Sequence, residues 1–122
     1  MIIEARGRQM IIEAISVPAK ETKFFARTRE NNEEVARSFI VVARNGLHKS
    51  PFALLEDVSV APGYREMGIG GSFVDRVIDE ARAENCYKLI STVRFDRSNL
   101  FAWYAKKGFM PWGIEFRMNL EP

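Results

Sequence analysis

The sequence predicts an α/β fold in which a mixed β-sheet is flanked by helices. Strand-like apolar segments fill the first half of the chain, and strand and helix alternate from Leu54 onward. The stretch 54–85 in particular combines a strand, a glycine-rich turn and an amphipathic helix. With 122 residues, the chain suits a single domain, residues 1–122, with a modest core.

The first half of the chain predicts three strands. They are expected at Met10–Val17, which Pro18 ends, at Lys23–Arg29 and at Val35–Arg44. Asn31 and Asn32 tolerate the backbone of a tight turn, so the last two strands should form a hairpin. A short helix over Asn32–Arg37 is the alternative. Residues 39–43 are continuously apolar, so we expect both faces of the third strand to be covered.

A short repeat opens the chain, because Met1–Ala5 recurs as Met10–Ala14. A repeat of five residues is too small to predict a structural unit, and we draw no function from it.

The second half of the chain predicts a strand at Leu54–Val60 that Pro62-Gly63 ends. The helix that follows carries one apolar stripe at helical spacing, made of Ile69, Phe73, Val74, Val77, Ile78 and Ala81. A strand at Tyr87–Val93 and a helix at Asn99–Lys107, which Gly108 ends, come next. Residues Ile114–Leu120 alternate between apolar and polar side chains and predict a last, half-buried strand.

Charge and cysteine content exclude several classes of protein. A net charge of +2 gives no bulk attraction to nucleic acid. No apolar run reaches the ~20 residues of a membrane span, and no signal peptide opens the chain. The single cysteine, Cys86, forms no internal disulfide and fits a reducing cytosol, so we expect a cytoplasmic protein. Cys86 itself is expected to pack rather than react.

The turn before the central helix has the pattern R-x-x-G-x-G, from Arg65 to Gly70. Its glycines let the backbone approach a ligand, and the free N–H groups of the helix's first turn favour a phosphate or pyrophosphate. A tight connection without a ligand is the alternative. A P-loop is excluded because no Gly-Lys-Ser/Thr follows, and the dinucleotide pattern G-x-G-x-x-G is absent.

At these residues the sequence resembles the GCN5-related N-acetyltransferase (GNAT) superfamily. Val60-Ala61-Pro62-Gly63-Tyr64-Arg65, followed by Gly68 and Gly70, is similar to that family's cofactor motif. A second family motif is matched by Trp103-Tyr104-Ala105-Lys106-Lys107-Gly108-Phe109, and the resemblance spans Leu54–Leu120. Two shorter pieces, Glu56–Val58 and Cys86–Ile90, are similar to the glucosamine-6-phosphate N-acetyltransferase branch.

The resemblance implies transfer of an acetyl group from acetyl-CoA, as co-substrate and without a metal, to a primary amine of a small molecule or a protein. The backbone of Val58, Ser59 and Val60 would hold the pantetheine arm by strand-like pairing. The pyrophosphate would lie against Arg65, Glu66, Met67, Gly68, Ile69, Gly70 and Gly71. Glu66 departs from the family's usual residues by adding negative charge there.

Acyl transfer needs a base, because an amine with a pKa of about 10.4 is protonated at neutral pH. Glu56 is the candidate base, and Asp57, expected on the opposite face of the strand, is the fallback. The resemblance places Tyr104 as the general acid that protonates the leaving thiolate. The alternatives are a surface carboxylate for Glu56 and a core tyrosine for Tyr104. Lys106 and Lys107 would either contact cofactor phosphate or remain solvated.

The front of the chain is shorter than the resemblance implies. The family carries one or two helices between its first two strands, whereas only Ser16–Thr22 separates them here. We therefore expect either an open acceptor site or a partner subunit that completes it. Trp112, Phe116 and the Phe24-Phe25 pair would leave aromatic surface uncovered, which favours a homodimer. A non-catalytic CoA-binding or protein-interaction module with the same fold is the rival interpretation.

Overall fold

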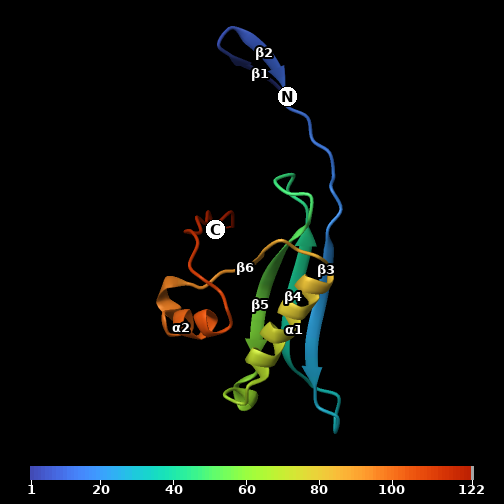
Figure 1. Ribbon diagram of the computed structural model, residues 1–122, viewed down its shortest axis with the longest axis vertical. Helices are drawn as coiled ribbons and strands as arrows, with labels where there is room; N and C mark the ends of the chain where they lie inside the picture. The colour runs from blue at the N-terminus through green and yellow to red at the C-terminus, as the bar shows by residue number, and fades with distance from the viewer. Residues whose placement is uncertain (122) are drawn as a thin grey trace.

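The computed structural model describes residues 1–121 and contains a four-stranded sheet in the order β3-β4-β5-β6 (Figure 1). The strands are β3 (Lys20–Arg27), β4 (Glu34–Ala43), β5 (Phe52–Val60) and β6 (Leu89–Ser91). The first three pair antiparallel, and β6 pairs parallel to β5. This mixed sheet confirms the predicted α/β class. It also rules out the alternative helix over residues 32–37, since β4 already begins at Glu34.

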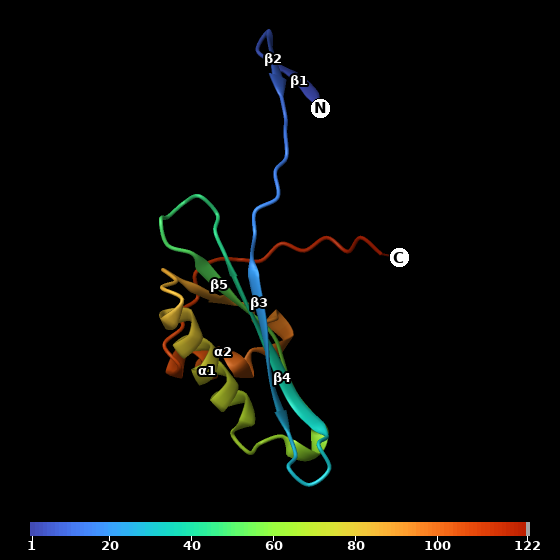
Figure 2. The ribbon, with the colours of Figure 1, turned by 90° about the vertical axis from the view of Figure 1, so that its right-hand side faces the viewer.

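Helix α1 (Ile69–Ala83) connects β5 to β6 and covers one face of the sheet (Figures 1 and 2). The predicted apolar stripe lies on the buried side of α1, where Val74 and Val77 have no exposed surface. Together with β4 and β5 it forms the core cluster of Ile40, Val42, Ala53, Leu55, Val74, Val77 and Ala81. The sheet and α1 therefore hold each other in place through this cluster.

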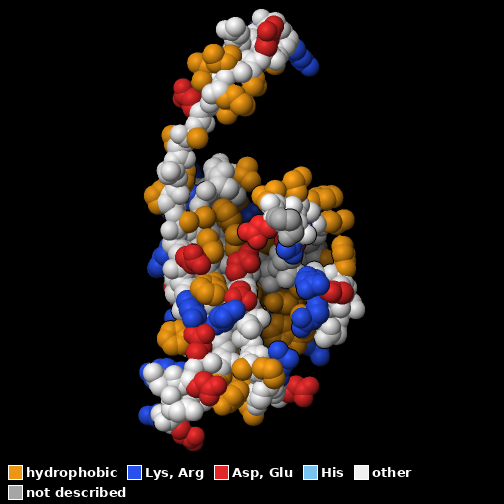
Figure 3. All heavy atoms as spheres, turned by 180° about the vertical axis from the view of Figure 1, so that it is seen from behind, with side chains coloured by type: hydrophobic (Ala, Val, Ile, Leu, Met, Phe, Trp, Pro, Cys, Tyr) orange, Lys and Arg blue, Asp and Glu red, His pale blue; other side chains and the backbone are white. Residues whose placement is uncertain are grey.

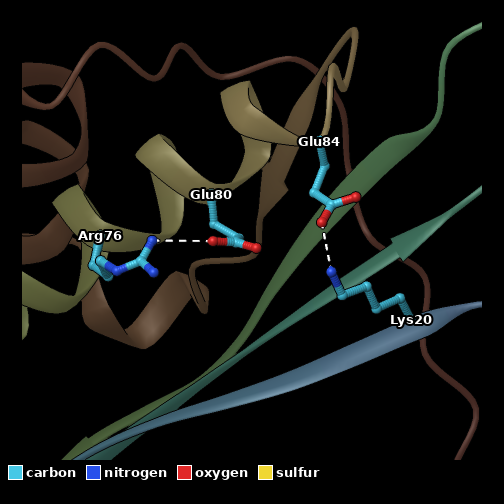
Figure 4. Close-up of polar contacts among 4 residues, drawn as sticks. All are labelled: Lys20, Arg76, Glu80 and Glu84. Carbon is cyan, nitrogen blue, oxygen red and sulfur yellow. Dashed lines mark hydrogen bonds and ion pairs between the residues drawn. The ribbon is translucent and has the colours of Figure 1, made fainter.

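The solvent side of α1 carries ion pairs (Figure 4). Arg76 and Glu80 pair along the helix at 3.1 Å, and Lys20 of β3 reaches Glu84 at the helix end at 2.5 Å. The hydrogen bond to Glu84 raises the pKa of the exposed Lys20 ammonium above its usual value. Exposed pairs of this kind contribute little free energy, so burial of the apolar stripe is the main term that binds α1 to the sheet.

The remaining helical elements are η1 (Pro62–Tyr64), η2 (Phe95–Arg97) and α2 (Asn99–Lys106), which confirms the predicted second helix. No helix precedes β4 within residues 1–121, so the front of the fold is trimmed as expected. Of the helices in this part of the chain, none combines the length and apolar character needed to cross a membrane.

The predicted first strand, Met10–Val17, is wrong. The structure instead pairs β1 (Ile2–Ala5) with β2 (Arg8–Ile11) in a separate two-stranded hairpin that projects from the sheet (Figure 1). The register places Ile2 opposite Ile11 and Ile3 opposite Met10, at the start of the second copy of the repeat, whereas Glu4 and Ala5 pair with Gln9 and Arg8 outside it. A turn at Arg6-Gly7 makes this local pairing available, and residues 12–19 form no strand.

The predicted last strand, Ile114–Leu120, is also absent. Residues 109–121 contain no helix or strand, and the segment runs out from the body of the molecule (Figure 2). The expected alternation is present in the sequence. A strand, however, needs a neighbour that completes its backbone hydrogen bonds, and none lies beside this segment within residues 1–121.

The prediction that both faces of β4 are covered is only half right. On the side of α1, Ala36, Ser38, Ile40 and Val42 are buried. On the other side, Phe39, Val41 and Ala43 are half-buried. The continuous apolar run indicated two covered faces, but the chain has no helix before β4 to supply the second cover.

Replacing Ile40 by alanine should destabilise the fold by about 2–5 kcal/mol, because the side chain is 1% exposed and its loss leaves a cavity in the core cluster. Ile15→Ala removes the same atoms from a side chain that is 87% exposed and is the control. Urea unfolding followed by circular dichroism measures both variants. Equal midpoints for the two would contradict the assigned core.

Candidate active site

An open strand edge forms where β5 and β6 separate. The parallel pairing covers only Ala53 to Leu55 of β5, opposite Leu89 to Ser91. Beyond this, β5 continues to Val60, and its only strand partner there among residues 1–121 is β4 on its other side. Among residues 1–121 no strand pairs with the side of residues 56–60 that faces β6, and the Val60 carbonyl oxygen accepts a hydrogen bond from Arg65 Nε. An extended ligand can pair with the remaining backbone groups of this edge. Val58, Ser59 and Val60, the predicted pantetheine residues, all lie on it.

A β-bulge interrupts β5 at the start of this edge. The register with β4 shifts between Arg37 and Phe39, and Asp57 adopts a positive φ of 51°. Because two residues of β5 oppose one of β4, the strict alternation of side chains is lost. Glu56 and Asp57 are consequently both exposed.

The bulge makes the predicted orientation of Asp57 wrong. Glu56 lies opposite Phe39, on the face of the sheet away from α1. The Asp57 carboxylate accepts a hydrogen bond from Arg37 at 2.9 Å, and Arg37 belongs to that same face of β4. Asp57 is thus held in an ion pair beside Glu56, and Glu56 is the carboxylate without such a partner among the described ion pairs.

The turn after β5 leads directly into the first turn of α1. Gly68 precedes the helix in a left-handed conformation, with φ 81°, and supplies no side-chain cap. No acidic residue lies in the first helical turn. The N–H groups at this helix end therefore lack a side-chain acceptor and point a positive partial charge outward.

The glycines at this helix end differ in what surrounds them. A Cβ atom at Gly70 would meet no other atom within 4 Å, so the chain's own packing does not require glycine there. A Cβ atom at Gly71 would lie 3.5 Å from Lys107 Nζ and 3.7 Å from Trp103. Gly70 thus borders open space, which fits a ligand that approaches the backbone closely.

The other residues of the predicted motif are exposed around the turn. The Arg65 Nε atom donates to the Val60 carbonyl oxygen at 2.9 Å, so this side chain folds back onto the end of β5. Glu66 has a positive φ of 64° and is exposed, as is Met67, whereas Ile69 is half-buried. Arg65 therefore ties the strand end to the turn.

Helix α2 brings two aromatic residues and a cation to this region. Tyr104 is half-buried, packs against the core cluster and makes edge-to-face contacts with Trp103 and Phe109, with ring centroids 5.0 and 5.4 Å apart. Both alternatives for Tyr104, core packing and general acid, are compatible with this placement. Tyr104 belongs to α2 and Glu56 to β5, so the two predicted catalytic residues are carried by different elements.

Lys107 is the residue whose position sequence reasoning missed. Its Nζ atom donates to Asp75 at 2.8 Å and to the Gly71 carbonyl oxygen at 3.4 Å, and it lies 5.7 Å from the Trp103 ring centroid. This places a half-buried cation beside the first turn of α1. From the sequence, Lys107 was expected either to contact cofactor phosphate or to remain solvated, and its contacts with Asp75 and Gly71 were not predicted.

Cys86 packs at the end of α1. It is half-buried against the core cluster, and burial together with nearby Glu84 raises the pKa of the Cys86 thiol. His48 stacks on the neighbouring Tyr87 at 4.4 Å, but its Nδ1 atom accepts a hydrogen bond from the Ser50 backbone. Within residues 1–121 no hydrogen bond joins His48 to Cys86.

Two shallow hollows are described, and neither contains Tyr104 or Gly70. The larger, of about 280 Å³, is lined by Pro18, Ala19, Lys20, Val42, Ala43, Arg44, Pro51 and Glu84. The smaller, of about 150 Å³, includes Ser59 and Ala61 at the end of β5. We base the site on the open edge of β5 and on the helix end, because both present unpaired backbone groups to a ligand.

The fold and the site together define an α/β protein with an open strand edge beside an uncapped helix end. Residues 6–109 match the family described as Acetyltransferase (GNAT) family. The chain belongs to this family, whose members transfer an acetyl group from acetyl-CoA to an amine. A comparison with curated proteins found no match.

Solved structures agree with this assignment. An acetyltransferase of Trypanosoma brucei is 21% identical, with a TM-score of 0.76 over 82% of this chain and 69% of its own. Glucosamine-6-phosphate N-acetyltransferase of Arabidopsis thaliana is 18% identical, with a TM-score of 0.75 over 83% and 67%. A transcriptional regulator from Bacillus halodurans C-125 is 21% identical, with a TM-score of 0.75 over 82% and 66%. At these identities the likenesses establish the fold.

Replacing Gly68 by alanine should destabilise the protein by about 1–2 kcal/mol, because φ at this position is 81° and an L side chain is strained there. Gly63→Ala is the matched control, since Gly63 has open space and no positive φ. Thermal unfolding of the two variants should differ clearly. Equal melting temperatures would show that Gly68 does not adopt the left-handed conformation in the turn before α1.

Proposed function

We propose that this protein is an acyl-CoA-dependent N-acetyltransferase that uses the open edge of β5 and the first turn of α1 to hold acetyl-CoA. The observation that carries the proposal is the position of these two features next to each other in a chain of the GNAT family. An extended pantetheine arm can pair with the backbone of Val58, Ser59 and Val60. The turn Arg65–Gly71 then presents N–H groups to the pyrophosphate.

Lys107 adds a cation to this binding region. Its ammonium donates to the Gly71 carbonyl oxygen and to Asp75 beside the first turn of α1, so it lies close to the helix end that would hold the pyrophosphate. Glu66, by contrast, places an exposed carboxylate in the same turn. The balance of these two charges sets how tightly the pyrophosphate is held. Lys107 lies on the buried side of the turn, where solvent screens its charge less than that of the exposed Glu66.

The proposed chemistry is direct attack of the amine on the acetyl thioester that the co-substrate supplies. Glu56 takes the proton from the amine, directly or through a water molecule, and Tyr104 gives its hydroxyl proton to the departing sulfur. A new carbon–nitrogen bond forms as the carbon–sulfur bond breaks. Glu56 lies on β5 at the start of the open edge and Tyr104 lies on α2, so the two groups would approach a substrate at this edge from different elements.

The acceptor is proposed to be a primary amine of a small molecule or of a protein. A glucosamine phosphate is one candidate, because a structural neighbour carries that activity and two short pieces of sequence are similar to it. The trimmed front leaves the acceptor side open, so we propose that a second subunit of a homodimer borders it. The single cysteine supports a cytoplasmic location.

The second candidate function is a CoA-binding or protein-interaction module without turnover. The exposed Glu66 in the phosphate turn and the absence of front helices within residues 1–121 favour it. Binding and turnover, measured separately, distinguish the two functions.

Acetyl-CoA binding is the first test. Gly70→Leu should weaken CoA and acetyl-CoA binding at least tenfold, equal to about 1.4 kcal/mol, because a side chain there fills the open space beside the helix end. Melting of Gly70→Leu should stay close to that of the natural chain, and Gly63→Leu is the control outside the first turn of α1. Titration calorimetry measures the affinities. No binding at millimolar CoA would contradict the proposed site.

Turnover is the second test. Tyr104→Phe should lower kcat by about 10²-fold or more with an accepted amine, since proton donation to sulfur is lost. Its affinity for CoA should be unchanged. Tyr87→Phe, a tyrosine away from the proposed site, is the matched control. Release of free CoA across a library of amines and peptides gives the rates, and CoA binding without any turnover would favour the module.

A further inference from the structure

The β-bulge in β5 places two carboxylates at adjacent positions on one face of the sheet. Glu56 lies opposite Phe39 of β4. The Asp57 carboxylate contacts Arg37, which puts it on that same face, away from α1. Val58, the next residue, packs against the core cluster on the side of α1. In a regular strand Glu56 and Asp57 would point to opposite faces, so the bulge is what brings a second negative charge beside the proposed base.

The backbone of Asp57 needs a contact that holds it. Its φ of 51° lies in the left-handed region, a conformation that strains a residue other than glycine. Ser38 opposes the bulge, because the register shifts between Arg37 and Phe39. The Ser38 side chain is fully buried, and its Oγ atom has no hydrogen-bond partner among residues 1–121. The side chain that faces the bulge from the core side therefore does not hold it.

Arg37 supplies a contact from the other face. Its Nε atom donates to Asp57 Oδ2 at 2.9 Å, and this hydrogen bond joins β4 to β5 across the bulge. A hydrogen bond between charged groups is stronger and more directional in effect than one between neutral groups. Both side chains are about half exposed, at 46% and 49%, so the pair adds little to the stability of the fold. Its effect is local, because it fixes the Asp57 carboxylate and pairs its charge.

Cations on this face pair with carboxylates other than Glu56. Figure 3 views the sheet from the side away from α1 and shows acidic and basic side chains mixed over it. Lys23 of β3 pairs with Glu34 at 2.5 Å, and Arg37 pairs with Asp57. No ion pair among residues 1–121 includes Glu56. Glu56 is therefore the carboxylate of the bulge that is left to take a proton from an amine.

We propose that Arg37 is a positioning residue for acetyl transfer and that it acts through Asp57. By holding Asp57, it keeps the bulge in the conformation that directs Glu56 toward the acceptor. By pairing the Asp57 charge, it prevents a second carboxylate from competing for the protonated amine. Arg37 is assigned no contact with the thioester or the amine. The inference rests on the proposed function, in which Glu56 is the base, and adds the residue that reserves this role for Glu56.

Removing this cation would leave two like charges at adjacent positions on one face. Their repulsion favours rotation of Asp57 away from Glu56, which changes the direction of the proposed base. An amine would also meet two unpaired carboxylates, and misplacement by about 1 Å is enough to slow a reaction strongly. Val58 would still pack against the core cluster, and Arg65 would still bond the Val60 carbonyl oxygen. The loss is therefore expected in turnover and not in CoA affinity.

The test is a double-mutant cycle in the full chain. Arg37→Met should lower kcat about tenfold with an accepted amine, while the CoA dissociation constant changes less than about twofold. In a chain that carries Asp57→Asn, the same Arg37→Met change should lower kcat less than about twofold, because no charge is left to be paired. Arg37→Lys keeps the charge and should recover most of the rate. Arg76→Met, which breaks an exposed pair with Glu80 on the solvent side of α1, is the matched control.

A second readout needs no turnover. The three-bond NMR coupling between the amide and α protons of residue 57 reports its φ. The left-handed value should be present in the natural chain, in Arg37→Lys and in Arg76→Met, and it should be lost in Arg37→Met. A coupling that Arg37→Met leaves unchanged would overturn the inference.

The rates can overturn it in three further ways. The kcat of Arg37→Met could stay within about twofold of the natural chain, or Arg37→Met could cost as much with Asn as with Asp at position 57. Asp57→Asn alone could also lower kcat tenfold or more, since Asp57 would then be the base. A natural chain that binds CoA without turnover contradicts the proposed function instead, and the coupling at residue 57 then decides whether Arg37 holds the bulge.

Discussion

The short pairing between β5 and β6 is the constraint on which the rest of the structure depends. Ala53 and Leu55 are buried under α1 and fix this end of β5 between β4 and β6. Because β6 ends at Ser91, the far half of β5 keeps one side of its backbone unpaired. An unpaired strand edge is costly in a folded protein unless it is exposed or receives a ligand. The site is thus a consequence of where one strand ends.

The core holds that edge in register with the helix end. Val74 and Val77 anchor α1 against Ile40 and Leu55, and the turn with Gly68 connects the end of β5 to the first turn of α1. The Arg65 side chain donates a hydrogen bond to the Val60 carbonyl oxygen, which restricts the conformations that this turn can adopt. Lys107 links α2 to α1 through Asp75, so the element that carries Tyr104 is tied to the same helix end. The packing of the core therefore also sets the positions of the strand edge, the helix end and α2 in the candidate site.

Sequence patterns predicted the elements that rest on local chemistry. The apolar stripe from Ile69 to Ala81 predicted α1, and Gly108 predicted the end of α2. The motif Arg65–Gly70 predicted the turn before α1. The bulge at Asp57 was not predictable, because aspartate tolerates a positive φ at many positions without adopting it. The contact between Lys107 and Asp75 was not predicted, since the two residues are 32 positions apart in the sequence. Both errors concern tertiary contacts that no local pattern encodes.

The two errors at the chain ends have a common physical cause. Periodicity shows that a segment has the side chains of a strand, but the strand forms only where another backbone is present to pair with it. The N-terminal residues 2–5 pair with residues 8–11, which follow them directly in the sequence, and a lone two-stranded hairpin is marginal in water. The C-terminal segment 109–121 has found no partner among residues 1–121. A fold without front helices thus keeps apolar segments that its own sheet does not cover, and assembly is the process that can bury them.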